Sequence, residues 1–199
     1  MAQHGFTNGV DVDGLRAAMD TIQDQPEMAS MQFRCKHRWG DNTHTYTTIQ
    51  DFTAGGMEQT NRPAPFVMEA DEPLILLGDD TAPNATEALL HALSSCLSTT
   101  FIYHASARGV EIDELELEME GTLDVRGVLG LSDEVRNGFE QINVVFHVKS
   151  DAPEEQISEL VELAQARSPV FDMVTHPTPV SVKGHKVEAL TAAPTRASI

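Results

Sequence analysis

The sequence predicts an α+β fold in which an antiparallel sheet packs against one long buried helix. Residues 85–107 are apolar on nearly every side of a helix, with few charges between Ala88 and Tyr103, which is typical of a helix buried on most sides. Residues 111–125 alternate apolar and glutamate side chains, as a strand with one face in water does. Short turns join the predicted strands, which favours antiparallel pairing.

The N-terminal part of the chain predicts a helix followed by strands. Apolar side chains recur at helical spacing over residues 13–25, and Pro26 ends this helix. Residues 31–38 and 43–52 are rich in β-forming residues and predict two strands joined by a turn at residues 40–42. Residues 64–70 predict a further strand, whose prolines place it at a sheet edge.

A polar turn over residues 79–84 leads into the long helix. Asn84 is a candidate N-cap and Glu87 follows three residues later, as in a capping box, while Gly109 supplies the stop. One face of this helix carries small or weakly polar side chains, which permit close approach of another backbone, such as that of a second copy. The members of this face are Ala85, Ala88, Ala92, Cys96, Thr99 and Tyr103.

The C-terminal half predicts two strands, two helices and a closing strand. The strands are expected over residues 111–125 and 141–149, with a loop at 127–138 between them. A helix from residue 151 to about Arg167, a short helix from Ser168 to Val174, and a strand over 178–187 follow. The sequence divides into an N-terminal extension (residues 1–30), one domain (31–188) and a disordered tail (189–199).

Composition excludes several classes of function. A formal net charge of −18 argues against nucleic-acid binding and against an anionic membrane surface as partner. No run approaches the roughly 18 apolar residues of a membrane span, and the N-terminus lacks the pattern of a secretory signal, so a cytoplasmic location is expected. The two cysteines, Cys35 and Cys96, have no disulfide-framework or zinc-site spacing; no metal and no cofactor are expected.

Cys96 is the candidate catalytic residue. A peroxide-reducing cysteine needs a thiolate, a cation or donor that holds it, and a route back to the thiol. The alternative is an inert core cysteine, since free cysteine is among the most buried residue types. His91 and His104 lie five and eight positions away, so neither forms a neighbouring Cys/His pair on one helix.

Two segments of the chain resemble the OsmC/Ohr family of osmotically inducible and organic-hydroperoxide-resistance proteins. The run from Pro83 to Cys96, PNATEALLHALSSC, is similar to the family helix, in which a glutamate precedes the peroxidatic cysteine; Glu87 and Cys96 match that spacing. The run ARSPV at 166–170, followed by Thr178-Pro179-Val180, is similar to the family's closing segment. The resemblance covers about residues 45–188.

The resemblance implies an intertwined homodimer with two long central helices between antiparallel sheets and sites where the subunits meet. It also implies attack of the Cys96 thiolate on an organic hydroperoxide, with Glu87 holding an arginine that stabilises the thiolate. In the family a second cysteine resolves the resulting sulfenic acid, and dithiols reduce the disulfide.

Two positions depart from the family pattern. Ser168 stands where the second cysteine is expected, and the strand before the long helix has no arginine, the nearest being Arg62, with Arg34 and Arg38 further back. Cys35 could resolve Cys96 or be incidental. Glu87 could act on the arginine or only cap the helix, and without a cation its charge would disfavour the thiolate.

Two functions remain open from the sequence. The first is an OsmC-like thiol-dependent hydroperoxide reductase, in which an external thiol recycles Cys96 after it reacts with a small hydrophobic hydroperoxide. The second is a stress-associated protein of the same fold that binds an apolar ligand and has little or no peroxidase activity. The retained Cys96 favours the first, and the missing arginine and Ser168 favour the second.

Overall fold

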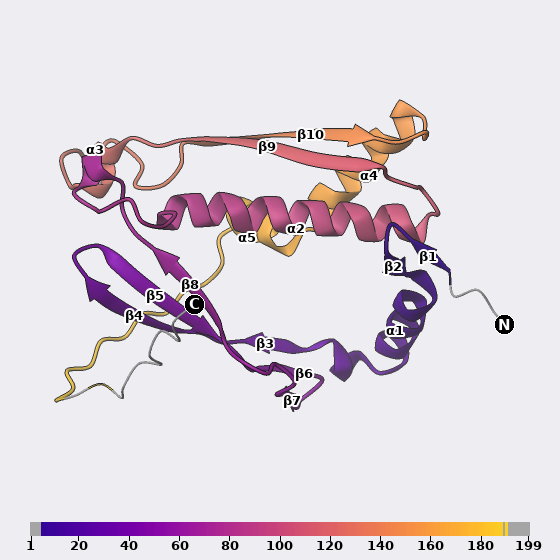
Figure 1. The fold of residues 1–199 in the computed structure, drawn as a ribbon, viewed down its shortest axis with the longest axis horizontal. Coiled ribbons are helices and arrows are strands. Elements are labelled where there is room, and N and C mark those ends of the chain that lie inside the picture. Colours follow the sequence, from indigo (N-terminus) through magenta and orange to yellow (C-terminus); the bar gives the residue numbers. More distant parts are fainter. Residues whose placement is uncertain (1–4, 189, 191–199) are drawn as a thin grey trace. The chain divides into compact units, whose positions relative to one another are not determined.

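The computed structural model describes residues 5–188 and residue 190, which pack into two compact units (Figure 1). The first unit contains the described residues through Ala29 together with Thr86–Thr175, and the second contains Ser30–Ala85 and the described residues from His176 onward. The predicted domain over residues 31–188 stays a prediction. The predicted tail, apart from residue 190, lies outside the described residues.

The first unit is built on helix α2, Ala85–Ala107, which matches the predicted long helix. The antiparallel strands β9 (Glu114–Thr122) and β10 (Gln141–Lys149) run along it (Figure 1). Helices α4 (Glu154–Arg167) and α5 (Pro169–Thr175) follow β10. The α+β class with antiparallel sheets is therefore confirmed.

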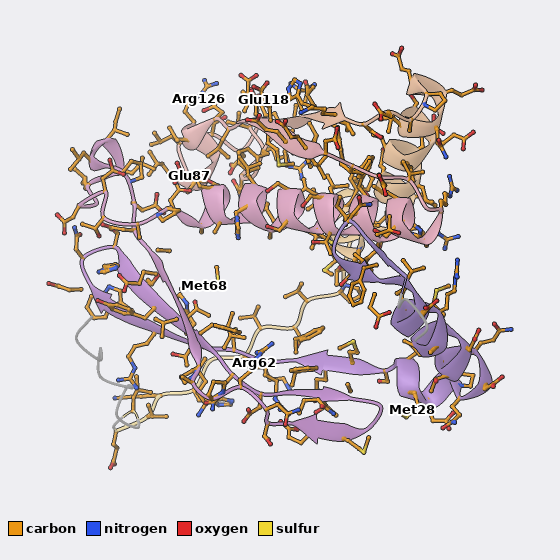
Figure 2. All side chains as sticks on the ribbon, turned by 45° about the vertical axis from the view of Figure 1, so that its right-hand side comes forward. Met28, Arg62, Met68, Glu87, Glu118 and Arg126 are labelled. Atoms are coloured by element: carbon orange, nitrogen blue, oxygen red, sulfur yellow. The ribbon has the colours of Figure 1, made fainter. Side chains whose placement is uncertain are left out.

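The core of the first unit lies where α2, α4 and the inner face of the β9–β10 hairpin meet. Alternation predicted this face, because every second residue of β9 and β10 is turned inward and the glutamates between them are exposed. Glu118, for example, lies on the outer side of β9 (Figure 2) and pairs with His147. The fully buried core residues are Phe101, Ala105, Val110, Leu160 and Ala164.

Helix α2 is buried along one face only within this chain. Its buried face carries Leu93, Leu97 and Phe101, whereas Leu89 and Tyr103 on other faces are 38% and 49% exposed. The predicted burial on most sides is thus not reached in the single chain. The helix ends as predicted at Gly109, whose φ of +69° is the left-handed conformation that favours glycine.

An N-terminal hairpin, which the sequence analysis did not predict, is fastened to the end of α2. Strands β1 (Phe6–Thr7) and β2 (Val10–Asp11) are joined by Asn8-Gly9, both with positive φ, the residue pair that a tight hairpin turn favours. Helix α1, Val12–Asp24, and a short 3-10 turn, η1 (Pro26–Ala29), follow.

The Asn8 side chain makes the attachment. Its Nδ2 donates to the Val110 carbonyl at 2.9 Å and to Ser106 Oγ at 3.1 Å. Its Oδ1 accepts from the Ile112 backbone N–H at 2.8 Å. Ser106 is buried, so these hydrogen bonds satisfy polar groups that water does not reach.

Asn8→Ala is expected to lower the free energy of unfolding by about 2–3 kcal/mol, because it removes three hydrogen bonds and leaves buried partners unpaired. Urea denaturation measures the change. Asn8→Gly is the matched control, because it removes the same hydrogen bonds but tolerates the positive φ. A stability of Asn8→Gly equal to that of the unmodified chain would show that the side-chain contacts contribute nothing.

The second unit contains two three-stranded antiparallel sheets. One has the order β3-β6-β7, and the other has the order β4-β5-β8. The predicted strand over 64–70 is confirmed at the edge of the second sheet, whereas the predicted strand over 43–52 is divided between β5 and β6. The elements are β3 Met31–Phe33, β4 Lys36–Asp41, β5 His44–Ile49, β6 Phe52–Ala54, β7 Met57–Gln59, β8 Phe66–Ala70 and the 3-10 turn η2 Leu74–Leu76.

Two sequence predictions are corrected. The strand predicted over 178–187 is absent from the structure, since this segment has no ladder partner among the described residues and its Val180 and Val182 are 81% and 88% exposed. The loop predicted over 127–138 begins within a short helix, α3 (Val125–Val128), which Asp124 caps through the Arg126 N–H.

Asp71 organises the loops of the second unit. Its carboxylate is 2% exposed and accepts from Thr43 Oγ1 at 2.6 Å, from the Thr81 N–H and hydroxyl at 3.1 and 2.9 Å, and from the Glu72 N–H at 2.9 Å. The hydrogen bond from Thr43, and then those from Thr81 and Glu72, hold the pKa of Asp71 well below its usual range, against the opposite effect of burial.

Asp71→Asn is expected to lower the thermal midpoint at pH 7 by several degrees, because an amide cannot accept all four hydrogen bonds. Since the pKa of Asp71 is lower in the folded than in the unfolded chain, its contribution is present above about pH 4 and is lost as the pH falls toward the folded pKa. Thermal melts between pH 7 and pH 2 check both statements. If the difference in thermal midpoint between Asp71→Asn and the unmodified chain stays the same in acid, the stabilising role of the Asp71 carboxylate is contradicted.

Candidate functional site

Cys96 opens into a hollow of the first unit that we call the Cys96 hollow. The hollow has a volume of about 570 Å³, is open to solvent, and lies between one face of α2 and the junction of α4 with α5. Helical spacing places Cys96 beside Ala92 and Thr99, and Tyr103 lies two turns further along the same predicted small face. The lining residues are Ala92, Ser95, Cys96, Thr99, Thr100, Tyr103, His104, Arg167 and Pro169.

The Cys96 thiol is free and half-buried. Its position on the fourth turn of a 23-residue helix fixes its backbone, and the Cys96 carbonyl accepts from Thr100 Oγ1 at 2.7 Å. A half-buried thiol that lines an open hollow is reachable by a small molecule. This geometry excludes a thiol sealed inside the core.

The polar lining of the hollow consists of hydrogen-bond donors and one permanent cation. Among the lining residues there is no aspartate or glutamate, although the whole chain has a net charge of −18. Burial, and then the charges of Arg108 and Arg167, lower the pKa of His104. This lowering favours the uncharged form of His104, and the permanent positive charge at the hollow belongs to Arg167.

Arg167 is the site residue that sequence reasoning missed. It is the last residue of α4, and the described residues give it no ion pair or side-chain hydrogen bond. The signal that points to it was present, because Arg167 directly precedes Ser168-Pro169 in a segment already singled out. Its distance along the chain from Cys96 concealed that the two residues line one hollow.

The structure does not bring the predicted pair Cys96 and Glu87 together within one chain. Nine helical residues separate them by about 13.5 Å along the axis and about half a turn around it. Glu87 lies near the start of α2 (Figure 2) and does not line the Cys96 hollow. Any contact between these two side chains therefore requires more than the single chain.

The arginines considered from the sequence, Arg34, Arg38 and Arg62, belong to the second unit. Arg34 pairs with Glu58. Arg62, labelled in Figure 2, donates to the Gln50 carbonyl, and its guanidinium carbon lies 5.1 Å from the ring centres of two phenylalanines, Phe52 and Phe66. Cys35 is exposed in the same unit.

Ser168 has a structural role at the position where a second cysteine was expected. Its side chain is 2% exposed, and its Oγ accepts from the Phe171 N–H at 3.2 Å, which caps the first turn of α5. Its own N–H donates to the Ala164 carbonyl at 2.9 Å, at the end of α4. Ser168 thus joins two helices, through its hydroxyl and its backbone N–H, and its hydroxyl supplies no redox chemistry.

The described residues contain neither a membrane-spanning helix nor a cluster of metal ligands. None of their helices is both long enough and apolar enough to cross a bilayer. No group of three or more histidine, cysteine, aspartate or glutamate side chains among them is arranged to hold a metal ion.

Comparison with known proteins gives a family and a fold. The family model described as "OsmC-like protein" matches residues 78–183. The chain is similar in structure to an OsmC-like protein from Mycoplasma pneumoniae, with a TM-score of 0.57 and 16% identity over 73% of this chain and 89% of that one. It is also similar in structure to a Psychrobacter arcticus protein provisionally assigned to the osmotic stress and detoxification response. That comparison gives a TM-score of 0.54 and 15% identity over 72% of this chain and 88% of that one. No curated protein matches the sequence.

Proposed function

Because the chain belongs to the OsmC-like protein family, we propose that it reduces organic hydroperoxides through the Cys96 thiol, with an external thiol as reductant. The observation that carries the proposal is the Cys96 hollow, in which a reachable thiol lies among donor groups, one cation and no carboxylate. Ala92 and Pro169 add apolar surface against which the organic part of a substrate packs.

The proposed reaction begins with attack of the Cys96 thiolate on the terminal oxygen of the hydroperoxide. An S–O bond forms and the O–O bond breaks, so the sulfur is oxidised to a sulfenic acid. The organic fragment leaves as an alkoxide and takes up a proton to become the alcohol. The donors of the hollow, Tyr103 among them, are suited to stabilising the leaving oxygen.

An external dithiol completes the cycle. Its first thiol displaces water from the sulfenic acid and forms a mixed disulfide, and its second thiol releases Cys96 and leaves as a cyclic disulfide. A cysteine at position 168 could have formed the first disulfide with Cys96 inside the protein, but Ser168 cannot form a disulfide. A cytoplasmic location, which two free cysteines favour, would supply such a reductant.

We also propose that the protein is a homodimer. Large apolar side chains stand exposed in both units, which is unusual for a monomer. In the first unit they cluster around α3, with Val128, Leu129 and Leu131 exposed by 62%, 57% and 71%, and in the second around η2. A catalytic role for Glu87 depends on this dimer, because helix α2 separates Glu87 from Cys96 within one chain. Light scattering after gel filtration measures the mass, and a monomer at micromolar concentration would overturn this part.

The test of the reaction is consumption of cumene hydroperoxide by the purified chain in the presence of dithiothreitol. The expected result is repeated turnover, with more than one equivalent of peroxide lost per chain. Loss at the rate of a protein-free blank would overturn the proposal.

A second function, binding of an apolar ligand without peroxidase activity, is favoured by one observation. The lining of the hollow offers apolar surface, while the second cysteine of the family is replaced by a serine with a structural role. In that case peroxide would be consumed at the blank rate, and an apolar fluorophore would still be retained in the hollow.

A further inference from the structure

We propose that Arg167 is the positioning residue that holds Cys96 as a thiolate, and this inference rests on the proposed thiol chemistry. The resemblance to the OsmC/Ohr family assigns this task to an arginine on the strand before the long helix, where this chain has none. Arg167 lines the Cys96 hollow from a different element, the end of α4.

Three observations support Arg167. It lines the same hollow as Cys96, and among the described residues no other lysine or arginine does so. The described residues give its guanidinium no carboxylate, so its charge is not already neutralised by an ion pair. It also contributes to lowering the pKa of His104, so its field acts inside the hollow.

The other groups that face the thiol do not supply a competing charge. From α2 these are Tyr103 and His104, and the lowered pKa of His104 favours its uncharged imidazole. Serine and threonine hydroxyls complete the polar lining, and α5 contributes only Pro169. A thiolate in a chain of net charge −18 is disfavoured by the overall field, so a local cation matters more here than in a neutral protein.

Arg167 also lies in the last turn of α4, where a cation interacts favourably with the helix end. Its replacement could therefore change stability as well as the thiol. The readout must consequently report the ionisation of Cys96 itself. The pH dependence of alkylation does so, because only the thiolate reacts.

The experiment measures the rate of iodoacetamide alkylation of Cys96 between pH 5 and pH 10, in a Cys35→Ser background that leaves one thiol. Replacing Arg167 by glutamine is expected to move the midpoint of this profile up by about one pH unit. Arg167→Lys is expected to keep most of the original midpoint, because it restores the charge.

Arg108→Gln is the matched control. Arg108 pairs with Glu159 at 3.5 Å and acts on His104, yet it does not line the Cys96 hollow. Its removal is expected to leave the midpoint within about 0.3 pH unit. Equal shifts in the Arg108 and Arg167 variants would overturn a specific role for Arg167.

The outcome separates this inference from the proposed function. An unchanged profile in Arg167→Gln overturns the inference, even if the unmodified chain consumes hydroperoxide. A shifted profile in a chain that consumes no hydroperoxide supports the role of Arg167 and overturns the peroxidase instead. Thermal melts of each variant show whether the fold is retained.

Discussion

Cys96→Ser is expected to lower dithiol-dependent consumption of cumene hydroperoxide by at least about a hundredfold, to the rate of the blank. Serine has nearly the same size as cysteine, so the Cys96 hollow is retained, but an alcohol oxygen is not ionised near neutral pH and cannot be oxidised to a sulfenic acid. Peroxide loss over time, measured with equal concentrations of both proteins, gives the ratio.

Cys35→Ser is the matched control for this result, because it removes the only other thiol and leaves the hollow unchanged. It is expected to retain full activity, since the proposed reductant is external. Loss of turnover in Cys35→Ser with one equivalent of peroxide still consumed would instead identify Cys35 as a resolving cysteine. Equal activity of Cys96→Ser and the unmodified chain would remove the proposed reaction.

Phe101→Ala is expected to lower the free energy of unfolding by about 3–5 kcal/mol. Phe101 is completely buried, its ring centre lies 5.7 Å from that of Phe146, and it belongs to the cluster that joins α2 to α4 and the β9–β10 hairpin. Truncation leaves a cavity at the junction of these three elements, and the packing contacts around it are lost. Urea denaturation measures the change.

Leu89→Ala is the control on the same helix. Leu89 is 38% exposed, so its truncation is expected to cost less than about 1 kcal/mol. If both variants lose the same free energy, the cluster around Phe101 does not carry the stability of the first unit. If Leu89→Ala lowers the free energy of unfolding more than Phe101→Ala does, an interface that covers this face of α2 contributes more to stability than the cluster.

The elements predicted well from the sequence are those whose pattern repeats over many residues. β10 has the predicted bounds, Gln141–Lys149, and α2 begins and ends where the capping signals place it. In β10 each residue follows the same alternation, so the burial of one face decides the structure, whereas in α2 signals at both ends bound one long apolar run. The segment 178–187 alternates only around Val180 and Val182, and a strand also needs a neighbour to pair with, about which a pattern within one segment carries no information.

The site was predicted in part. Cys96 was found from a local motif, because its neighbours on α2 are also its neighbours in sequence. Arg167 was not found, since 71 positions separate it from Cys96 and only the packing of α4 beside α2 brings both to one hollow. The β1–β2 hairpin was missed for a different reason. Its strands are two residues long, too short for alternation, although Asn8-Gly9 is itself a turn signal.

The attachment through Asn8 has a consequence for how the polypeptide emerges from the ribosome. Asn8 is made about a hundred residues before Val110 and Ile112, its partners. At a synthesis rate of roughly 5–20 residues per second, the first thirty residues wait for several seconds without their docking surface. During that interval the backbone of the β1–β2 hairpin is open to chaperones and proteases, so the earliest-made part of the first unit is among the last to be secured.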